Sequence, residues 1–409
     1  MIDHAVWECA NPARIQALIS LAEARAKILA HIPVPDVECI PLAQARDRVF
    51  ARPITCPTDV PAFDNSQVDG YALRSADEGI RRIVGESAAG GPPPPPLAAG
   101  QAIRIFTGAP IPDGADAVIM QEDAAVEADG VAPTEPVHPG QFIRFRGEEI
   151  EAGTDFDVTG LPATPPLVGL AASFGLTEIP VFQRPRVAIL ATGSELIRLG
   201  EPIGAGQTYA SNLESLHAAF EALGLAAQTL LVGDDRQATR EALAAALDEA
   251  DVLVTTGGVS VGDHDHIRPA LGDLGVEELF WRVDIKPGKP FFCGTLGSKL
   301  IFGLPGNPVS ALVTYHVLVR PALRRLLGLR TAEEDQTARL AHAIQRTDLR
   351  YEFLRATLCE GVVTAVAKQG SHMQTGLAFA DALLHLPRGE ATFVEGQPVT
   401  VTPIRWSAE

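Results

Sequence analysis

The sequence predicts a multidomain protein of the α/β plus β class, and two patterns along the chain indicate it. Between residues 183 and 328, short apolar runs alternate with helical stretches, which is typical of a doubly wound parallel α/β domain. Before and after that region, short β-like runs are separated by prolines and glycines, which indicates β-rich domains. A chain of 409 residues has room for about two to four domains.

Composition limits the partners and the location of the protein. The hydrophobic share of 46% and the charged share of 21% are typical of a folded globular chain. A net charge of −18 repels a phosphate backbone, so we expect no nucleic-acid partner. We find no signal peptide and no apolar run of about 20 residues, and therefore expect a cytoplasmic protein with no membrane association. The five cysteines are scattered without a CxxC pair, which disfavours a disulfide framework and a zinc site.

The N-terminal part begins with a predicted helix at residues 12–31, where apolar side chains recur every three or four positions. Prolines then break the helical pattern, and short β-runs continue to about residue 145. Residues 90–97, GGPPPPPL, predict a stiff polyproline loop between two strands, with an SH3-type ligand as the alternative.

The central region alternates strands and helices. Strands are predicted within residues 184–196, 226–235, 251–263 and 299–308, the first of them followed by a turn and a polar helix start at TGSE. Helices are predicted at 211–223, with Ser211 or Asn212 as N-cap, at 236–250, and at 309–328, with Asn307 as cap, Pro308 in the first turn and Gly328 at the end. After about residue 330 the pattern predicts a small β domain.

The carboxyl ends of these strands carry polar and glycine-rich turns, and ligands bind at such ends in open α/β sheets. Gly257 and Gly258, followed by Ser260, would let a ligand approach the backbone and would offer free N–H groups to an anion. The alternative is a tight strand-to-helix turn without a ligand. The motif is neither a Walker loop nor the dinucleotide GxGxxG pattern.

Acidic residues follow several of the same strands: Glu195, Asp234, Asp235, Asp263 and Asp265. Carboxylates gathered at neighbouring strand ends would repel one another without a cation, and oxygen ligands suit Mg²⁺. Helix capping is the alternative for any single acid. His264 and His266 alternate with the last two acids, so either a transition-metal site or solvated loop histidines can explain that segment.

The DIKPGKP segment presents Lys286 and Lys289 on a turn fixed by proline and glycine. Two ammonium groups close to a glycine-rich anion site predict a phosphate or oxyanion clamp, with a plain surface turn as the alternative. Farther towards the N-terminus, Asp69 lies in a cluster of short polar side chains that turn capping can explain, and Thr107 follows a strand.

The motifs VDGYA, TGAPIPDGADAVI, TGSEL, TTGGVSVGDHD, IKPGKP and LPGNPVSA together resemble the molybdopterin molybdenumtransferase family, which is similar to the E domain of gephyrin. The resemblance runs from about residue 12 to 403. It implies a discontinuous domain I (1–52 and 145–182), a β-rich domain II (53–144), the α/β molybdopterin-binding domain III (183–328) and a C-terminal β domain IV (329–409). It also implies a homodimer, with an active cleft between domain III of one subunit and domain II of the other.

The family reaction inserts molybdate into adenylylated molybdopterin and releases AMP, with Mg²⁺ as cofactor. The resemblance implies small-molecule substrates. It also suggests a molybdopterin adenylyltransferase and acceptor molybdoenzymes as protein partners. The implied catalytic residues are Asp69, Thr107, Glu195, Asp234 and Asp265, and the implied metal ligands are Glu195, Asp234, Asp263 and Asp265. The implied substrate-binding residues are Gly257, Gly258, Ser260, Arg282, Lys286, Lys289, Pro305, Pro308, Arg355 and Ser371.

One residue departs from the family pattern. Arg282 follows Trp281 where bacterial relatives carry lysine, which keeps the charge and changes the geometry of an oxyanion contact. Two other functions stay open from the sequence: an adenylyltransferase, because domain III resembles the stand-alone enzymes of that type, and a gephyrin-like scaffold without catalysis. The sequence does not distinguish molybdate from tungstate, which are oxyanions of similar size.

Overall fold

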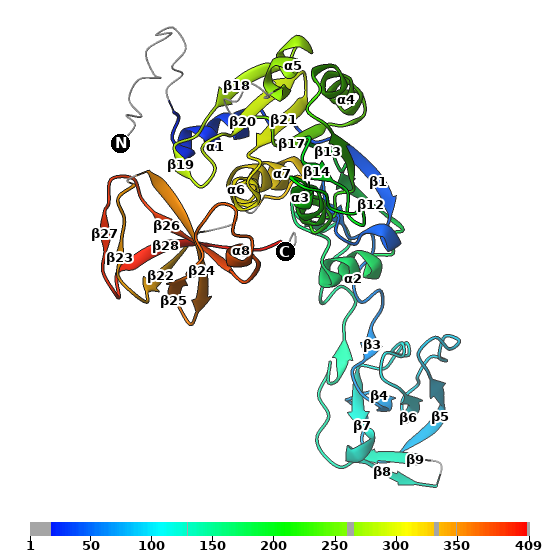
Figure 1. Ribbon diagram of the computed structural model, residues 1–409. Coiled ribbons are helices and arrows are strands. Elements are labelled where there is room, and N and C mark those ends of the chain that lie inside the picture. The colour runs from blue at the N-terminus through cyan, green and yellow to red at the C-terminus, as the bar shows by residue number, and fades with distance from the viewer. Residues whose placement is uncertain (1–17, 129, 260–265, 331–334, 349, 407–409) are drawn as a thin grey trace, which may run out of the picture. The chain divides into compact units, whose positions relative to one another are not determined.

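The structure, a computed structural model, describes residues 18–128, 130–259, 266–330, 335–348 and 350–406 (Figure 1). The chain divides into two compact units, and each is described by itself. The first unit comprises residues 1–52, 159–165 and 178–409, and the second comprises 53–158 and 166–177. The four-domain division drawn from the sequence stays a prediction. In the described ranges, no helix has both the length and the apolar character needed to cross a membrane.

A six-stranded sheet organises the α/β part of the first unit, in the order β16-β13-β17-β21-β20-β18 (Figure 1). Its strands are β13 (Val187–Thr192), β16 (Ala227–Val232), β17 (Val252–Thr256), β18 (Glu277–Trp281), β20 (Phe292–Leu296) and β21 (Lys299–Leu304). The strands β16, β13, β17 and β21 pair in parallel, as the alternating pattern predicts. The other two pair antiparallel. The strand β20 is the reversed one, because only a short turn at Gly297 separates it from β21, and such a turn can join only antiparallel strands.

Helices cover both faces of this sheet. They are α3 (Ser211–Glu221), α4 (Arg236–Glu249), α5 (Ile267–Asp273), α6 (Pro308–Thr314) and α7 (Arg320–Leu326), with the π-helical turn η3 (Tyr315–Val319) between the last two. Alternate residues of β13 face opposite layers: Ile189 joins the core formed with α3, α6 and α7, whereas Leu190 joins the core formed with α4 and α5. Every residue of β13 is buried, which explains its uninterrupted apolar run.

The predicted helix at residues 309–328 is present as α6, η3 and α7 in succession, with Pro308 in the first turn. Gly328 ends it with φ of +80°, and a Cβ there would lie 2.0 Å from the Phe182 ring, so only glycine fits.

Two local predictions between residues 192 and 212 are wrong. TGSE leads into the short strand β14 (Leu196–Ile197), which pairs with β15 (Thr208–Tyr209). No helix starts between β14 and α3, because Pro202 and three glycines interrupt residues 198–207. The N-cap of α3 is Ala210, without a side-chain cap.

The N-terminal helix α1 (Leu21–Ala30) starts later than predicted. Ser20 and Glu23 form a capping box: the Ser20 hydroxyl accepts from the Glu23 N–H at 3.2 Å, and the Ser20 N–H donates to the Glu23 carboxylate at 2.8 Å. This cap fixes the start of the helix at residue 21, and residues 12–17 lie outside the described ranges. Nearby, β1 (Val37–Pro41) leads into a 3₁₀ turn, η1 (Leu42–Gln44), and pairs antiparallel with β12 (Glu178–Phe182).

The C-terminal part of the first unit is a small β domain, as the short β-runs predict, and the structure shows that its strands form a barrel. Its strands are β22 (Gln336–Leu340), β24 (Tyr351–Cys359), β25 (Val362–Ala365), β26 (Ala382–Leu386) and β28 (Pro398–Pro403), accompanied by β23 (Ile344–Gln345), β27 (Thr392–Phe393) and α8 (Thr375–Ala378). The order β24-β25-β22-β28-β26 closes through pairing of β24 with β26. The strand β19 (Ile285–Lys286), which belongs to the IKPGKP motif, pairs with β24 and so attaches this motif to the barrel.

The second unit contains a six-stranded sheet in the order β7-β4-β6-β5-β9-β8. The strands are β4 (Gly70–Leu73), β5 (Arg81–Ser87), β6 (Gln101–Ile105), β7 (Ala117–Met120), β8 (Ala124–Glu127) and β9 (Gly130–Pro133). Smaller elements are β2 (Ile54–Thr55), β3 (Asn65–Ser66), η2 (Gln121–Asp123), β10 (Ile143–Arg144), β11 (Asp155–Phe156) and α2 (Pro165–Ser173). The polyproline segment lies between β5 and β6, which pair in parallel and therefore need a long connection.

Candidate functional site

The carboxyl ends of β13, β16, β17 and β21 meet at one edge of the α/β sheet, and a cavity of about 810 Å³ opens there. The sequence-predicted residues that line it are Glu195, Asp234, Gly257, Gly258, Pro305 and Pro308. Segments that are far apart in the sequence therefore meet at one site, and we call it the carboxylate cavity.

Ser194 and Asp234 join the turns after β13 and β16. The Asp234 carboxylate accepts from the Ser194 N–H at 2.9 Å, and the Ser194 hydroxyl accepts from the Asp234 N–H at 3.1 Å. Glu195 follows in the same turn and is exposed. The neighbouring Asp235 has a different role, because its carboxylate accepts from the Ala238 N–H at 2.7 Å and caps α4.

The glycine pair forms a tight turn after β17, with φ of +86° at Gly257 and +62° at Gly258. A Cβ on Gly257 would lie 2.7 Å from the Thr192 carbonyl oxygen, and one on Gly258 would lie 2.8 Å from the Ile267 side chain. Packing alone thus requires glycine at both positions. The cavity that the turn borders, and not the glycine pair, therefore indicates a ligand site.

Asn212 is a wall residue that the sequence indicated only as a possible helix cap. Its amide donates to the Thr256 hydroxyl at 2.9 Å and to the Gly306 carbonyl at 2.8 Å, which ties α3 to the turns after β17 and β21. Tyr209 and Gln374 also line the cavity and were not predicted. No motif marks these three residues, because their positions depend on how the turns pack.

A second cavity, of about 490 Å³, borders the IKPGKP turn and the barrel. Its predicted lining residues are Lys286, Lys289, Arg355 and Ser371, and Arg350 adds a further cation. We call it the cationic pocket. Arg355 is 1% exposed, and its guanidinium donates to the carbonyls of Lys368 at 2.7 Å and Gly370 at 3.2 Å, which shapes the loop that carries Ser371. Burial lowers the pKa of Arg355 from its usual value.

The two cavities are adjacent, since Pro290 lines both. Hydrogen bonds fix the barrel segment between them: the Asn307 amide donates to the Ser371 hydroxyl at 3.0 Å, and the Gln374 amide donates to the Ser211 hydroxyl at 2.9 Å. A ligand with two polar ends could therefore contact both cavities.

Asp69 and Thr107 lie together in the second unit. The Asp69 carboxylate accepts from the Thr107 N–H and from the Thr107 hydroxyl, both at 2.7 Å. The backbone hydrogen bond, followed by the hydroxyl bond, lowers the pKa of Asp69 below its usual value. The pairing keeps this carboxylate ionised and fixed in orientation.

The remaining predicted residues are not placed in these cavities. The Arg282 guanidinium lies over the Trp281 ring, 4.1 Å from its centroid, and lines neither cavity. Ser260, Asp263 and Asp265 lie outside the described residues, as does His264. Among the residues that the structure describes, no group of three or more potential metal ligands is assembled. The residue roles drawn from the sequence, that of Arg282 included, stay predictions.

Known protein families match this chain along nearly its whole length. Three family profiles match: "MoeA N-terminal region (domain I and II)" at residues 19–175, "Probable molybdopterin binding domain" at 188–325, and "MoeA C-terminal region (domain IV)" at 337–404. The molybdopterin molybdenumtransferase of Haemophilus influenzae is 36% identical over 405 residues, covering 94% of this chain and 98% of the relative. Molybdopterin molybdenumtransferase 2 of Mycobacterium tuberculosis is 36% identical over 381 residues, covering 88% and 94%.

A solved structure of the same type supports the fold. The crystal structure of a molybdopterin biosynthesis MoeA protein from Pyrococcus horikosii has a TM-score of 0.85 at 30% identity, covering 95% of this chain and all of that one. The architecture and these matches define a multidomain molybdenum-cofactor biosynthesis protein built around a molybdopterin-binding α/β domain. More specifically, the chain belongs to the molybdopterin molybdenumtransferase family, as the sequence motifs indicate.

Proposed function

We propose that this protein inserts molybdate into adenylylated molybdopterin and releases AMP, forming molybdenum cofactor. The observation that carries the proposal is the contact between two unlike cavities, one lined by carboxylates and glycines and the other by lysines and arginines. The proposed reaction needs carboxylates to hold a metal cation beside the phosphoanhydride, and it needs cationic side chains to hold the molybdate anion. Two adjacent cavities of opposite charge meet both needs. The names of the relatives, molybdopterin molybdenumtransferases, support the same reaction.

The carboxylate cavity is proposed to hold the phosphoanhydride. Glu195 and Asp234 both line it and offer oxygen donors of the kind that Mg²⁺ prefers, so the donor set fits this ion. Bound there with the predicted ligands Asp263 and Asp265, Mg²⁺ would neutralise charge that develops on the phosphates. Backbone N–H groups at the start of α3, which has no side-chain cap, lie in the same wall and can bind phosphate oxygens.

The cationic pocket is proposed to hold the molybdate oxyanion. Lys289 is exposed at its rim, and the hydroxyl of Ser371 offers a neutral hydrogen-bond donor beside it. Fixed cations and donors stabilise an oxyanion without reorganising during the reaction. The metal bonds to sulfur of the pterin substrate, so no protein cysteine is needed.

Asp69 and Thr107 are proposed to be catalytic as a pair, because their mutual hydrogen bonds fix one anionic oxygen in place. We further propose a homodimer, a cytoplasmic location, and contacts with a molybdopterin adenylyltransferase and acceptor molybdoenzymes. These proposals rest on the family resemblance.

The decisive experiment measures AMP release from adenylylated molybdopterin with Mg²⁺, in the presence and absence of molybdate. We expect release that depends on molybdate. Substrate binding without release, with molybdate and with tungstate, would contradict the proposal and favour a scaffold or an adenylyltransferase. Consumption of ATP with unadenylylated molybdopterin would identify the latter.

A further inference from the structure

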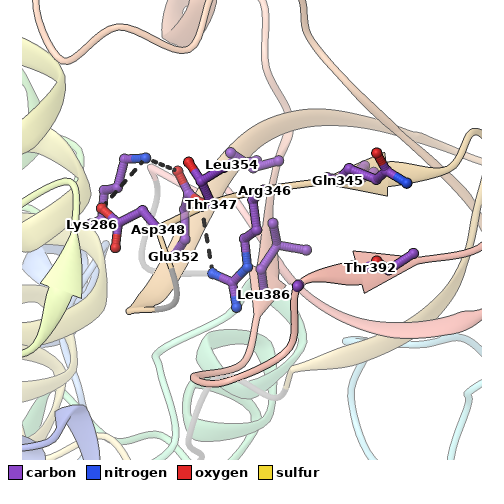
Figure 2. A pocket seen from close by; sticks show the side chains of 11 residues that line it. Lys286, Gln345, Arg346, Thr347, Asp348, Glu352, Leu354, Leu386 and Thr392 are labelled. Atoms are coloured by element: carbon purple, nitrogen blue, oxygen red, sulfur yellow. Dashed lines mark ion pairs between the residues drawn. The ribbon is translucent and has the colours of Figure 1, made fainter.

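Lys286 lies at the boundary between the cationic pocket and a third cavity of about 610 Å³ on the barrel side (Figure 2). Figure 2 shows its ammonium group pointing toward two carboxylates. The Nζ atom lies 2.9 Å from Glu352 Oε1 and 3.8 Å from Asp348 Oδ2. The ammonium of this predicted substrate-binding lysine is therefore already engaged by protein anions.

The pairing of Lys286 with Glu352 is fixed by the backbone. The two residues are direct partners across the parallel strands β19 and β24. Opposite charges at directly facing positions of a sheet attract each other, and the strand pairing holds them at short range without a flexible loop.

Glu352 is also held from its other side. Its Oε2 atom lies 3.7 Å from Arg346 Nη1. The Arg346 guanidinium is itself fixed, because it donates to the carbonyls of Arg350 at 2.6 Å, Glu390 at 2.7 Å and Pro387. The Glu352 side chain is 9% exposed, so it has little freedom to turn away from the lysine.

Among the described residues that line the cationic pocket, Glu352 is the one carboxylate beside four cations: Lys286, Lys289, Arg350 and Arg355. A negative charge in this wall opposes the entry of a dianion. Asp348 does not line the pocket and makes hydrogen bonds to Arg350.

We propose that Glu352 sets the oxyanion affinity of the cationic pocket, because its carboxylate competes with the incoming dianion for the ammonium group of Lys286. The residue is a positioning residue that acts through Lys286. It holds the lysine in place when no oxyanion is bound and keeps the bound dianion from being held too tightly. The inference rests on the proposed assignment of this pocket to the oxyanion substrate.

The test compares Glu352→Gln with the wild-type chain by calorimetric titration with molybdate and by steady-state AMP release. Glutamine keeps the shape and a hydrogen-bond acceptor for Lys286 while removing the charge. We expect the dissociation constant and the KM for molybdate to fall roughly tenfold, without a rise in kcat. Damage to the fold would raise KM, so a lower KM separates the proposed role from a purely structural one.

Two further variants make the comparison sharp. Glu395→Gln removes one exposed acid from the same barrel and should leave the molybdate affinity unchanged. Glu352→Asp shortens the side chain by one methylene and so moves the carboxylate away from Lys286. Its affinity for molybdate should lie between those of the wild type and Glu352→Gln. If the glutamine variant does not fold, the aspartate variant tests the proposed role of Glu352 in its place. Equal or weaker binding in a folded Glu352 variant would overturn the inference alone. A wild-type protein that bound no molybdate would instead overturn the assignment of the pocket.

Discussion

Ser194 and Asp234 hold the turns after β13 and β16 together through two reciprocal hydrogen bonds, of 2.9 and 3.1 Å. The bonds use one carboxylate oxygen, the serine hydroxyl and two backbone N–H groups. The rest of the Asp234 carboxylate remains available at the wall of the carboxylate cavity. One residue therefore both shapes the turn and presents a charge to the carboxylate cavity.

Adjacent acids with different contacts provide a test of this site. Asp234→Asn keeps an oxygen that can accept from Ser194, but it removes the charge, and we expect AMP release to fall by a factor on the order of 10². Asp235→Asn should keep activity, because asparagine caps the start of a helix about as well as aspartate. The measurements are initial rates of AMP release and thermal unfolding of both variants. Equal activity in the two would remove Asp234 from the proposed mechanism.

Glu195 gives an independent test, because it is exposed and its function does not depend on packing. Glu195→Gln should change the free energy of unfolding by less than about 0.5 kcal/mol and should abolish molybdate-dependent turnover. Glu277→Gln, an exposed position on β18, is the matched control and should retain full activity. A Glu195→Gln enzyme with wild-type kcat and Mg²⁺ dependence would show that this carboxylate does not bind the metal.

Much of the fold could be predicted from the sequence, because apolar periodicity reports burial directly. The uninterrupted run of β13 and the alternating strands and helices that follow led to the parallel sheet. The start of α1 was missed, since the capping box at Ser20 outweighs the apolar spacing before it. The reversed strand β20 was also missed, because its direction follows from the short turn at Gly297 that joins it to β21.

For the candidate site, the motifs indicated the residues that carry charge or flexibility, such as Glu195 and Lys289, but not those that connect the turns. Asn212 has no motif, and its two hydrogen bonds exist only once α3 and the strand ends meet. Glu352 was missed for a similar reason: it is 66 residues from Lys286 along the chain, and only the β19–β24 register brings them together. The motifs therefore predicted charged residues that line the cavities more readily than the residues that hold their walls together.

Gly288 of the IKPGKP turn should be intolerant of a side chain. Its φ is +113°, and a Cβ would lie 2.3 Å from the methyl group of Thr314, the last residue of α6, which is buried and whose hydroxyl donates to carbonyls of the preceding turn. We expect Gly288→Ala to lower the free energy of unfolding by about 2–4 kcal/mol and to weaken molybdate binding, because Lys286 and Lys289 move with the turn. Gly389→Ala is the control, since its φ is +88° but no atom lies within 4 Å, so it carries backbone strain alone. Similar unfolding curves for the two variants would contradict the proposed clash.

His385 of the barrel should make stability depend on pH. Its ring bonds to the Tyr351 hydroxyl at 2.7 Å and to the Thr402 hydroxyl at 2.6 Å, and Asp335 lies 3.9 Å away. Burial lowers the pKa of His385 to about 4, although Asp335 acts in the opposite direction. The unfolded chain, with a pKa near 6.5, therefore binds more protons than the folded chain between these values.

The stabilisation from neutral His385 should be complete above about pH 6.5 and should be lost as the pH falls toward 4, amounting to about 2 kcal/mol between pH 6.5 and 5. Thermal unfolding of the full chain at several pH values in this window measures the slope. His385→Gln removes the titrating group and should flatten the slope, whereas His342→Gln, at an exposed position, should leave it unchanged. A slope that persists in His385→Gln would mean that another group controls the acid sensitivity of the protein.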